Sequence, residues 1–133
     1  MGKEINESGF QGEELIENFL KKNGFAYNHN STKGIDFEIF TKRKTFFVDS
    51  KNQNSGGSVD EKLLQMARKY WRKYNYKDVY IVCGKHKIDK EVIISLKEDE
   101  VAYGYKTHIM EFQQFSDMML DEIPDSPLDK FFT

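Results

Sequence analysis

The chain has 133 residues, enough for one hydrophobic core with helices packed on a sheet. Its 20 Lys and Arg are balanced by 22 Asp and Glu, which argues against a uniformly basic nucleic-acid-binding protein, and no apolar run approaches the roughly 20 residues that a membrane helix requires. The single cysteine, Cys83, ends an apolar run, which indicates a buried thiol. We therefore expect a cytoplasmic protein that spans no membrane, with residues 1–133 forming one domain.

The first predicted helix covers about residues 11–23. Ser8 and Gln11 have the spacing of a capping box at its start, and Gly24 follows as a left-handed cap. Its apolar stripe consists of Leu15, Ile16, Phe19 and Leu20. This pattern is typical of a helix that packs one face against a core.

One carboxylate of this helix is placed to face a sheet. At about 100° per residue, Glu13 lies at the margin of the apolar stripe, whereas Glu17 lies farther round and Glu14 points away. Glu13 could therefore join acids on the sheet in a two-cation site or a site that positions water. Glu13 and Glu14 would equally favour the positive end of the helix dipole, so a structural role stays open.

A polar loop is expected next, over residues 29–32. His29 in this loop can contact a phosphate or act as a proton shuttle, and it can equally be an ordinary surface residue. We keep both interpretations at this point.

Two strands are predicted over residues 35–40 and 45–51, joined by the short polar connection 41–44 as an antiparallel hairpin. Alternation in the first strand puts Ile35, Phe37 and Ile39 on one face and Asp36 and Glu38 on the other. Alternation in the second puts Phe47, Asp49 and Lys51 on one face and Phe46, Val48 and Ser50 on the other.

The ends of this hairpin carry the candidate chemistry. Asp36 begins the first strand and Asp49 ends the second, so both acids lie at the same end, with Lys51 two residues farther on. Two carboxylates and an amine at one place can hold a divalent cation and assist cleavage of a phosphodiester. Acids on an exposed strand face are also commonly no more than solvated, and that alternative stays open.

The segment after Lys51 contains two further candidates for supporting residues. Gln53 lies in a loop rich in Asn, Ser and Gly, which is long enough to contact DNA or to act as a simple crossover. A second helix is predicted over Ser58–Tyr74, with Ser58 and Glu61 in capping-box spacing. Gln65 lies off the centre of the apolar stripe of this helix.

The remainder of the chain indicates structure rather than chemistry. We expect a strand over residues 79–83, a helix or strand over 88–98, a strand over 107–111 and a helix over 112–120. The tail, residues 121–133, either packs across a neighbouring subunit or is a frayed end.

Charge is segregated along the chain. Residues 62–90 carry nine Lys or Arg against two Asp, and residues 98–130 carry nine acids against two Lys. A basic middle segment can present a positive face to phosphates. A solvated helix face accounts nearly as well for Arg68, Lys69, Arg72 and Lys73.

Four motifs, taken in chain order, resemble those of the PD-(D/E)XK nuclease superfamily. They are Gly9-Phe10-Gln11-Gly12-Glu13, Lys22-Asn23-Gly24-Phe25, Gly34-Ile35-Asp36 and Phe47-Val48-Asp49-Ser50-Lys51. The resemblance covers roughly residues 9–83; the first seventy residues are most similar to archaeal Holliday-junction resolvases, and residues 52–63 resemble small restriction endonucleases. Two departures are that no proline precedes Asp36 and that Asp49 stands where Glu is more frequent.

The resemblance implies roles for individual residues. Asp36 and Asp49 would be cation ligands, Ser50 would add its backbone carbonyl, and Glu13 would be a further ligand or a partner through water. Lys51 would orient the attacking water or help to deprotonate it. Oxygen ligands without a Cys or His cluster favour Mg²⁺ as the cofactor, with Mn²⁺ as a substitute.

These observations predict an α/β fold with a restriction endonuclease-like core, in which a central mixed β-sheet is flanked by α-helices. The expected function is that of a Mg²⁺-dependent endonuclease that hydrolyses duplex or branched DNA, either restriction-type or resolvase-like, and acts as a homodimer. A toxin-type nuclease and a catalytically silent module that binds nucleic acid or protein are the alternatives.

Overall fold

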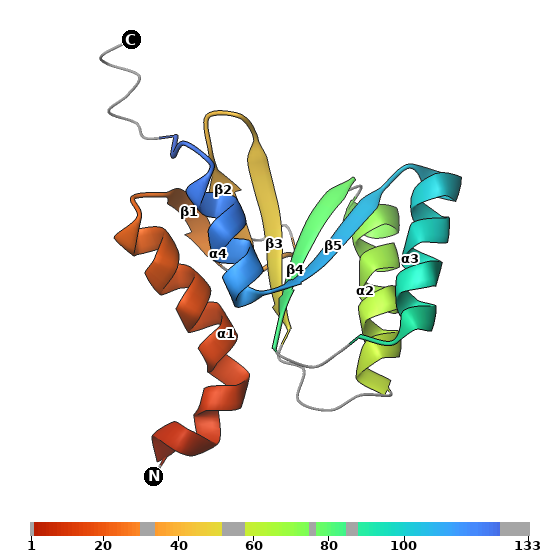
Figure 1. The fold of residues 1–133 in the computed structure, drawn as a ribbon, viewed down its shortest axis with the longest axis horizontal. Coiled ribbons are helices and arrows are strands. Elements are labelled where there is room, and N and C mark those ends of the chain that lie inside the picture. The colour runs from red at the N-terminus through yellow and green to blue at the C-terminus, as the bar shows by residue number, and fades with distance from the viewer. Residues whose placement is uncertain (1, 30–33, 52–57, 75–76, 85–87, 126–133) are drawn as a thin grey trace.

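The computed structural model describes residues 2–29, 34–51, 58–74, 77–84 and 88–125, and of residues 2–11 and 58–62 it describes only the backbone. The described chain forms helices and strands around one sheet (Figure 1). In chain order these are α1 (Gly2–Lys22), β1 (Ala26–His29), β2 (Phe37–Phe40), β3 (Thr45–Lys51), α2 (Ser58–Tyr74), β4 (Asp78–Cys83), α3 (Lys90–Tyr103), β5 (Lys106–Glu111) and α4 (Phe112–Leu120).

The strands form one mixed sheet in the order β1-β2-β3-β4-β5. The pairs β1–β2 and β2–β3 are antiparallel, whereas β3–β4 and β4–β5 are parallel. The two parallel pairs are connected through α2 and α3, as parallel strands require a crossover. The predicted α/β class, a mixed sheet flanked by helices, is confirmed.

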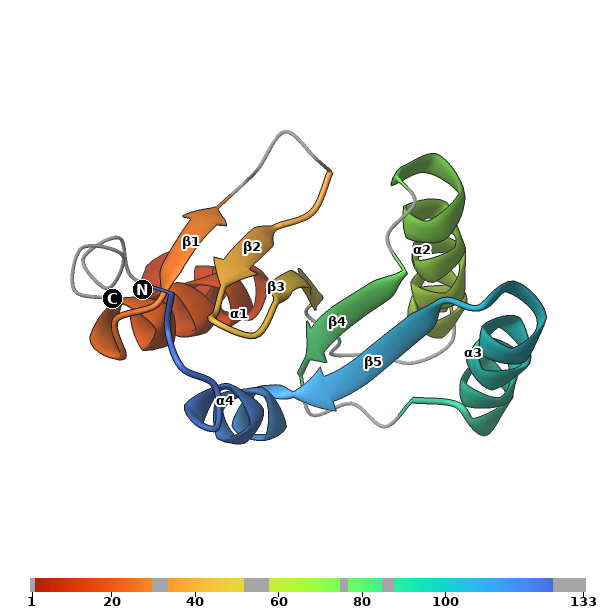
Figure 2. The same ribbon diagram turned by 90° about the horizontal axis from the view of Figure 1, so that it is seen from above.

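Helices cover both faces of the sheet. α1 and α4 lie on one face, and α2 and α3 lie on the other (Figures 1 and 2). Alternate residues of each strand enter alternate cores, so Phe46 and Val48 pack with α1 and α4, whereas Phe47 packs on the α2 side. This alternation decides on which face each candidate site residue lies.

Several elements have the predicted bounds. β3 ends at Lys51, α2 covers Ser58–Tyr74 and α4 covers Phe112–Leu120. The turn between β2 and β3 is closed by Thr41, whose backbone N–H donates to Lys44 O at 3.0 Å and whose hydroxyl donates to the same oxygen at 2.8 Å. Of the segment 88–98, for which the sequence allows a helix or a strand, the part from Lys90 on is helical and belongs to α3, which is followed by Gly104 as a left-handed C-cap.

The predicted start of the first helix is wrong. α1 begins at Gly2 and continues through Ser8, so Ser8 is not its N-cap. Glycines within a helix cost about 1 kcal/mol each relative to Ala, and Gly9 and Gly12 therefore make the sequence resemble a helix boundary. At Gly12 the missing side chain has a packing role, because an added Cβ would collide with Ser50 Oγ of β3.

Two expectations for the segment before β2 are also wrong. His29 is not in a loop but ends β1, a four-residue strand too short to give a clear alternation. β2 begins at Phe37 rather than Ile35, because a bend at residues 34–36 precedes it and Gly34 has a φ of 80°. Ile35 consequently packs in the α2-side core and does not share a face with Phe37 and Ile39.

The first residues of the tail are ordered against the hairpin. Pro124 forms an isolated β-bridge with Thr41, and the backbone N–H of Lys42 donates to Ile123 O at 2.9 Å. The predicted alternatives for residues 126–133 lie outside the described residues. Among the helices that the structure describes, none has the length and apolar character needed to cross a membrane.

Candidate active site

Asp36 and Asp49 face each other at one end of the β2–β3 hairpin. Phe37 pairs with Val48 in this hairpin, and continuing the register by one residue places Asp36 opposite Asp49. The backbone N–H of Asp36 donates to Asp49 Oδ1 at 3.2 Å, and the backbone N–H of Ser50 donates to Asp36 Oδ2 at 2.9 Å. Each carboxylate is thus held by a backbone amide from the opposite segment.

Asp49 is an acid inside the core. It is 3% exposed, and the Tyr70 hydroxyl donates to its Oδ2 at 2.7 Å. Burial, followed by the hydrogen bond and charge of Asp36, raises the pKa of Asp49 to about 7, against the opposing effects of Tyr70 and Lys51. Because a bound cation would offset the cost of burying this negative charge, the donor set and its surroundings fit a divalent cation.

Lys51 lies next to this pair. It is two residues from Asp49 on β3, so both side chains project from the α2 face of the sheet, and Lys51 Nζ is 4.0 Å from Asp49 Oδ2. The Lys51 side chain is 47% exposed. The ammonium group of Lys51 is therefore accessible from solvent next to the buried carboxylate of Asp49.

Ser50 separates these two residues and projects from the other face. There its Oγ lies so close to Gly12 of α1 that a Cβ at that position would collide with it. The Ser50 N–H is used by Asp36, and its Cα is paired with Val82 in β4. The carbonyl of Ser50 stays a predicted cation ligand.

Two tyrosines of α2 border the acids and are absent from the predicted site. Tyr70 is 5% exposed and hydrogen-bonded to Asp49. A Cβ added at Gly34 would lie 2.5 Å from Tyr74 Cζ, so the Tyr74 ring packs directly against the bend before Asp36. Their helical spacing is that of residues packed in a core, so the sequence did not indicate a role at the site. The one property that could have pointed to Tyr70 is that a buried tyrosine needs a hydrogen-bond partner for its hydroxyl.

The predicted supporting glutamines are not placed with the acids. Gln65 is exposed on α2, and at about 100° per residue it lies some 140° round the helix from Tyr70. Gln53 falls in residues 52–57, outside the described residues.

A further buried acid, Glu38, is 4% exposed and accepts a hydrogen bond from Asn28 Nδ2 at 3.0 Å.

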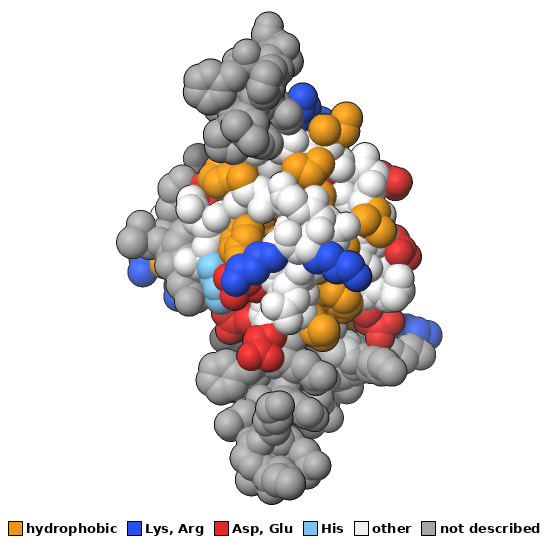
Figure 3. All heavy atoms as spheres, turned by 90° about the vertical axis from the view of Figure 1, so that its left-hand side faces the viewer, with side chains coloured by type: hydrophobic (Ala, Val, Ile, Leu, Met, Phe, Trp, Pro, Cys, Tyr) orange, Lys and Arg blue, Asp and Glu red, His pale blue; other side chains and the backbone are white. Residues whose placement is uncertain are grey.

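Glu13 contacts His29 instead of the acid pair. Glu13 Oε1 lies 2.9 Å from His29 Nε2, and Glu17 Oε2, one turn farther along α1, lies 3.3 Å from His29 Nδ1. Figure 3 looks onto the α1 side of the molecule and shows acidic, histidine and basic side chains gathered on this face. Within the described part of the chain, no three His, Cys, Asp or Glu side chains are grouped as a metal site.

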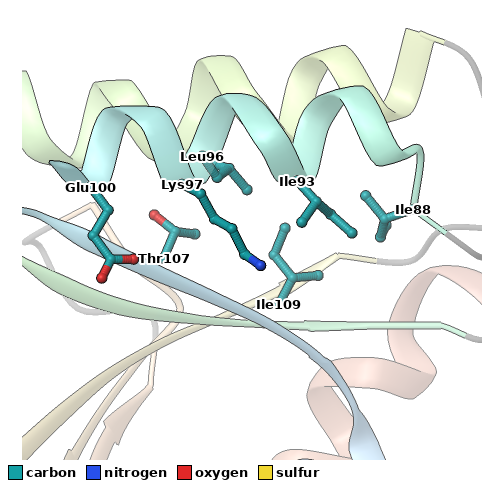
Figure 4. A pocket seen from close by; sticks show the side chains of 7 residues that line it. All are labelled: Ile88, Ile93, Leu96, Lys97, Glu100, Thr107 and Ile109. Atoms are coloured by element: carbon teal, nitrogen blue, oxygen red, sulfur yellow. The ribbon is translucent and has the colours of Figure 1, made fainter. Parts of the chain in front are cut away.

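A hollow elsewhere on the molecule does not involve these residues. It lies between α3 and β5 and has a volume of about 210 Å³ (Figure 4). Small-molecule sites usually have roughly 300–1,000 Å³. The residues that line it are Ile88, Ile93, Leu96, Lys97, Glu100, Thr107 and Ile109. Its small volume and a lining that contains a single carboxylate make the acid pair the better candidate site.

Comparison with protein families shows to which family the chain belongs. Residues 26–123 match the family model described as a PD-(D/E)XK nuclease superfamily domain. The chain belongs to the PD-(D/E)XK nuclease superfamily. The matched span of this PD-(D/E)XK domain contains Asp36, Asp49 and Lys51, whereas Glu13 precedes it. No curated protein and no solved structure shows a significant match to the chain.

Membership of the PD-(D/E)XK superfamily implies a nuclease, and therefore a nucleic-acid substrate. PD-(D/E)XK nucleases generally use divalent metals. The paired carboxylates of Asp36 and Asp49 are oxygen donors of the kind that Mg²⁺ and Mn²⁺ prefer.

Proposed function

We propose that this PD-(D/E)XK domain is a Mg²⁺-dependent endonuclease that hydrolyses phosphodiester bonds of DNA. The observation that carries the proposal is the pairing of Asp36 with Asp49 at one end of the sheet, with Lys51 Nζ 4.0 Å from the buried carboxylate. Asp36 and Asp49 are the residues that would hold the cation, with the Ser50 carbonyl as a further donor.

Each residue of the site has a separate task in this mechanism. A divalent cation bound at the acid pair supplies Lewis-acid polarisation of the phosphate and a lowered pKa of bound water. The Lys51 ammonium group orients the attacking water by donating a hydrogen bond to its oxygen, and the water loses its proton to solvent as its oxygen bonds to phosphorus. The bond from phosphorus to the leaving sugar oxygen then breaks, and that oxygen is protonated from solvent.

The surroundings of Asp49 prepare it for this task. The Tyr70 hydroxyl and the backbone N–H of Asp36 fix both carboxylate oxygens, so the side chain does not have to reorganise when the substrate arrives. Asp36 is fixed in turn by the Ser50 N–H. Burying a carboxylate without a compensating cation costs folding free energy. This preorganised pair is therefore better explained by a role in catalysis than by a structural role.

The substrate class within DNA distinguishes the restriction-type, resolvase-like and toxin-type forms of the proposal. A homodimer with two sites would serve the restriction-type and resolvase-like forms, because each must cut two strands. A four-way junction cut symmetrically, with linear duplex left intact, would indicate a resolvase. Cleavage of linear duplex at defined positions would indicate a restriction-type enzyme, and unspecific cleavage of DNA or RNA would indicate a toxin-type nuclease.

The experiment is a cleavage assay on supercoiled plasmid, linear duplex, single-stranded DNA, RNA and a four-way junction. Each substrate is incubated with Mg²⁺, with Mn²⁺ or with a chelator, and Asp49→Ala serves as the inactive control. We expect cation-dependent cleavage by the natural chain and none by the variant. Salt-dependent DNA binding without product under either cation would instead indicate a catalytically silent binding module.

A further inference from the structure

The basic residues in the second half of α2 do not share one environment. Arg68 is tied to α3, because its Nε donates to Asp99 Oδ2 at 2.8 Å. Lys69, Arg72 and Lys73 are exposed, and within the residues that the structure describes none of these three forms an ion pair. Their positive charges are therefore available to a partner outside the chain.

Helix geometry places the two lysines on the flank of α2 that is turned away from α3. Lys69 and Trp71 precede and follow Tyr70, so at about 100° per residue they lie on opposite sides of it. Trp71 stacks on Tyr105, which follows α3, at a centroid distance of 5.5 Å. The side of Trp71 is therefore the side toward α3. Lys73, one turn after Lys69, lies about 40° from it on the opposite flank.

Lys73 lies near the bend that carries Asp36. Its Nζ is 5.5 Å from the centroid of the Tyr74 ring. The same ring packs against Gly34, which precedes Asp36 in this bend. Lys51, with a side chain that is 47% exposed, lies beside the other acid of the pair. Two ammonium groups that reach solvent thus border the acid pair, one next to the buried carboxylate and one near the bend.

We propose that Lys69 and Lys73 bind the phosphate backbone of DNA beside the phosphodiester that is cut. Lysine binds phosphate as a point charge, and such contacts fix the position of the DNA without reading its sequence. The chain has a net charge of −2, so its attraction for DNA must come from a local group of cations, and these two lie one helical turn apart next to the acid pair. This inference rests on the proposed function, because its ligand is the DNA cleaved at that pair.

Binding of a fluorescent DNA duplex at several salt concentrations tests the inference, in an Asp49→Asn background that leaves the duplex uncut. Lys69→Gln and Lys73→Gln should each raise the dissociation constant about three- to tenfold, and the slope of log K against log salt should fall by about 0.9 for each lysine. Lys73→Arg keeps the charge and should bind as the background does. Arg72→Gln is the matched control, because it removes the same charge about 160° round the helix from Tyr70 and should leave the slope unchanged.

Steady-state cleavage kinetics separate this inference from the proposed function. In the active chain, the Lys69→Gln/Lys73→Gln double variant should raise KM and leave kcat nearly unchanged, because contacts to phosphates outside the reacting group bind substrate and transition state alike. An unchanged KM in the double variant, or equal losses of DNA binding in Lys73→Gln and Arg72→Gln, would overturn the inference and leave the proposed function standing. A natural chain that neither binds nor cleaves DNA would overturn the proposed function, and the inference with it.

Discussion

The buried carboxylate of Asp49 lowers the free energy of unfolding but has a use in the proposed reaction. Asp49 is buried, and burial, with the neighbouring Asp36, raises its pKa to about 7, so its ionised form is less favoured than that of an ordinary aspartate. A hydrophobic residue at this strand position would pack without that cost. The proposed cation site gives a reason for an acid at this position, where it is hydrogen-bonded to Tyr70 and lies beside Lys51.

The Tyr70 hydroxyl is the side-chain group that holds Asp49. Tyr70→Phe keeps the ring in the core and removes the donor at 2.7 Å. We expect the free energy of unfolding to fall by about 1 to 3 kcal/mol, as for a lost buried hydrogen bond to a charged group. Cleavage should fall by about 10- to 100-fold, as for loss of a residue that orients a metal ligand.

The matched control for this change is Tyr103→Phe, because Tyr103 is 52% exposed. Chemical denaturation and initial cleavage rates measure both effects. Full activity of Tyr70→Phe would show that the hydroxyl does not position Asp49 for the reaction.

At the scale of elements, the bend before β2 places Asp36. Gly34 has a φ of 80°, and its Cα faces the Tyr74 ring of α2. Gly34→Ala should therefore combine the roughly 1–2 kcal/mol cost of a left-handed L-residue with a collision. Gly104→Ala has the same strain at a φ of 78° but open space around the added Cβ.

We expect Gly34→Ala to lose at least about 1 kcal/mol more unfolding free energy than Gly104→Ala, since its collision adds to the common strain. Denaturant titration of the two variants measures the difference. Equal losses would mean that Tyr74 does not support the bend.

α2 and α3 are tied together by a buried acid. Arg68 Nε donates to Asp99 Oδ2 at 2.8 Å, and the Tyr105 hydroxyl donates to the same oxygen. The hydrogen bond from Arg68, then that from Tyr105, lowers the pKa of Asp99 below its usual 3.8 against the effect of burial. Because the folded-state pKa lies below the unfolded one, this stabilisation is present above pH 3.8 and is lost as the pH falls through the folded-state pKa.

Asp99→Asn should lower the free energy of unfolding at pH 7 by about 1 kcal/mol, a value reduced because the Arg68 side chain is 40% exposed. The difference from the natural chain should shrink as the pH falls below about 4. Urea denaturation between pH 3 and pH 7 measures it. A difference that is constant over this range would contradict the assigned role of the Asp99 carboxylate.

At the scale of the whole molecule, the fold class and the hairpin were accessible from sequence because strong local patterns encode them. Alternation fixed the faces of β3, and a short polar turn placed Asp36 and Asp49 at one end. The start of α1, strand β1 and the role of Tyr70 were not accessible. Each depends on a tertiary contact: Gly12 against Ser50, β1 pairing with β2, and a hydroxyl buried against Asp49.

The proposed homodimer is a second property of the whole molecule. Two active sites are needed if the enzyme cuts both strands of a duplex or junction in one encounter. Light scattering after size exclusion should therefore give twice the 15.7 kDa of a single chain. A mass of one chain, with and without bound DNA, would contradict the dimer while leaving the active site unaffected.

The most direct measurement of the central claim is the initial rate of plasmid cleavage in Mg²⁺ by three variants beside the natural chain. Asp49→Asn and Lys51→Ala each remove one group of the proposed site, whereas Lys90→Ala removes an exposed lysine of α3. We predict loss of cleavage by at least about 100-fold in the first two, with folding retained, and no change in the third. Undiminished cleavage by folded Asp49→Asn and Lys51→Ala would contradict the assignment of the active site.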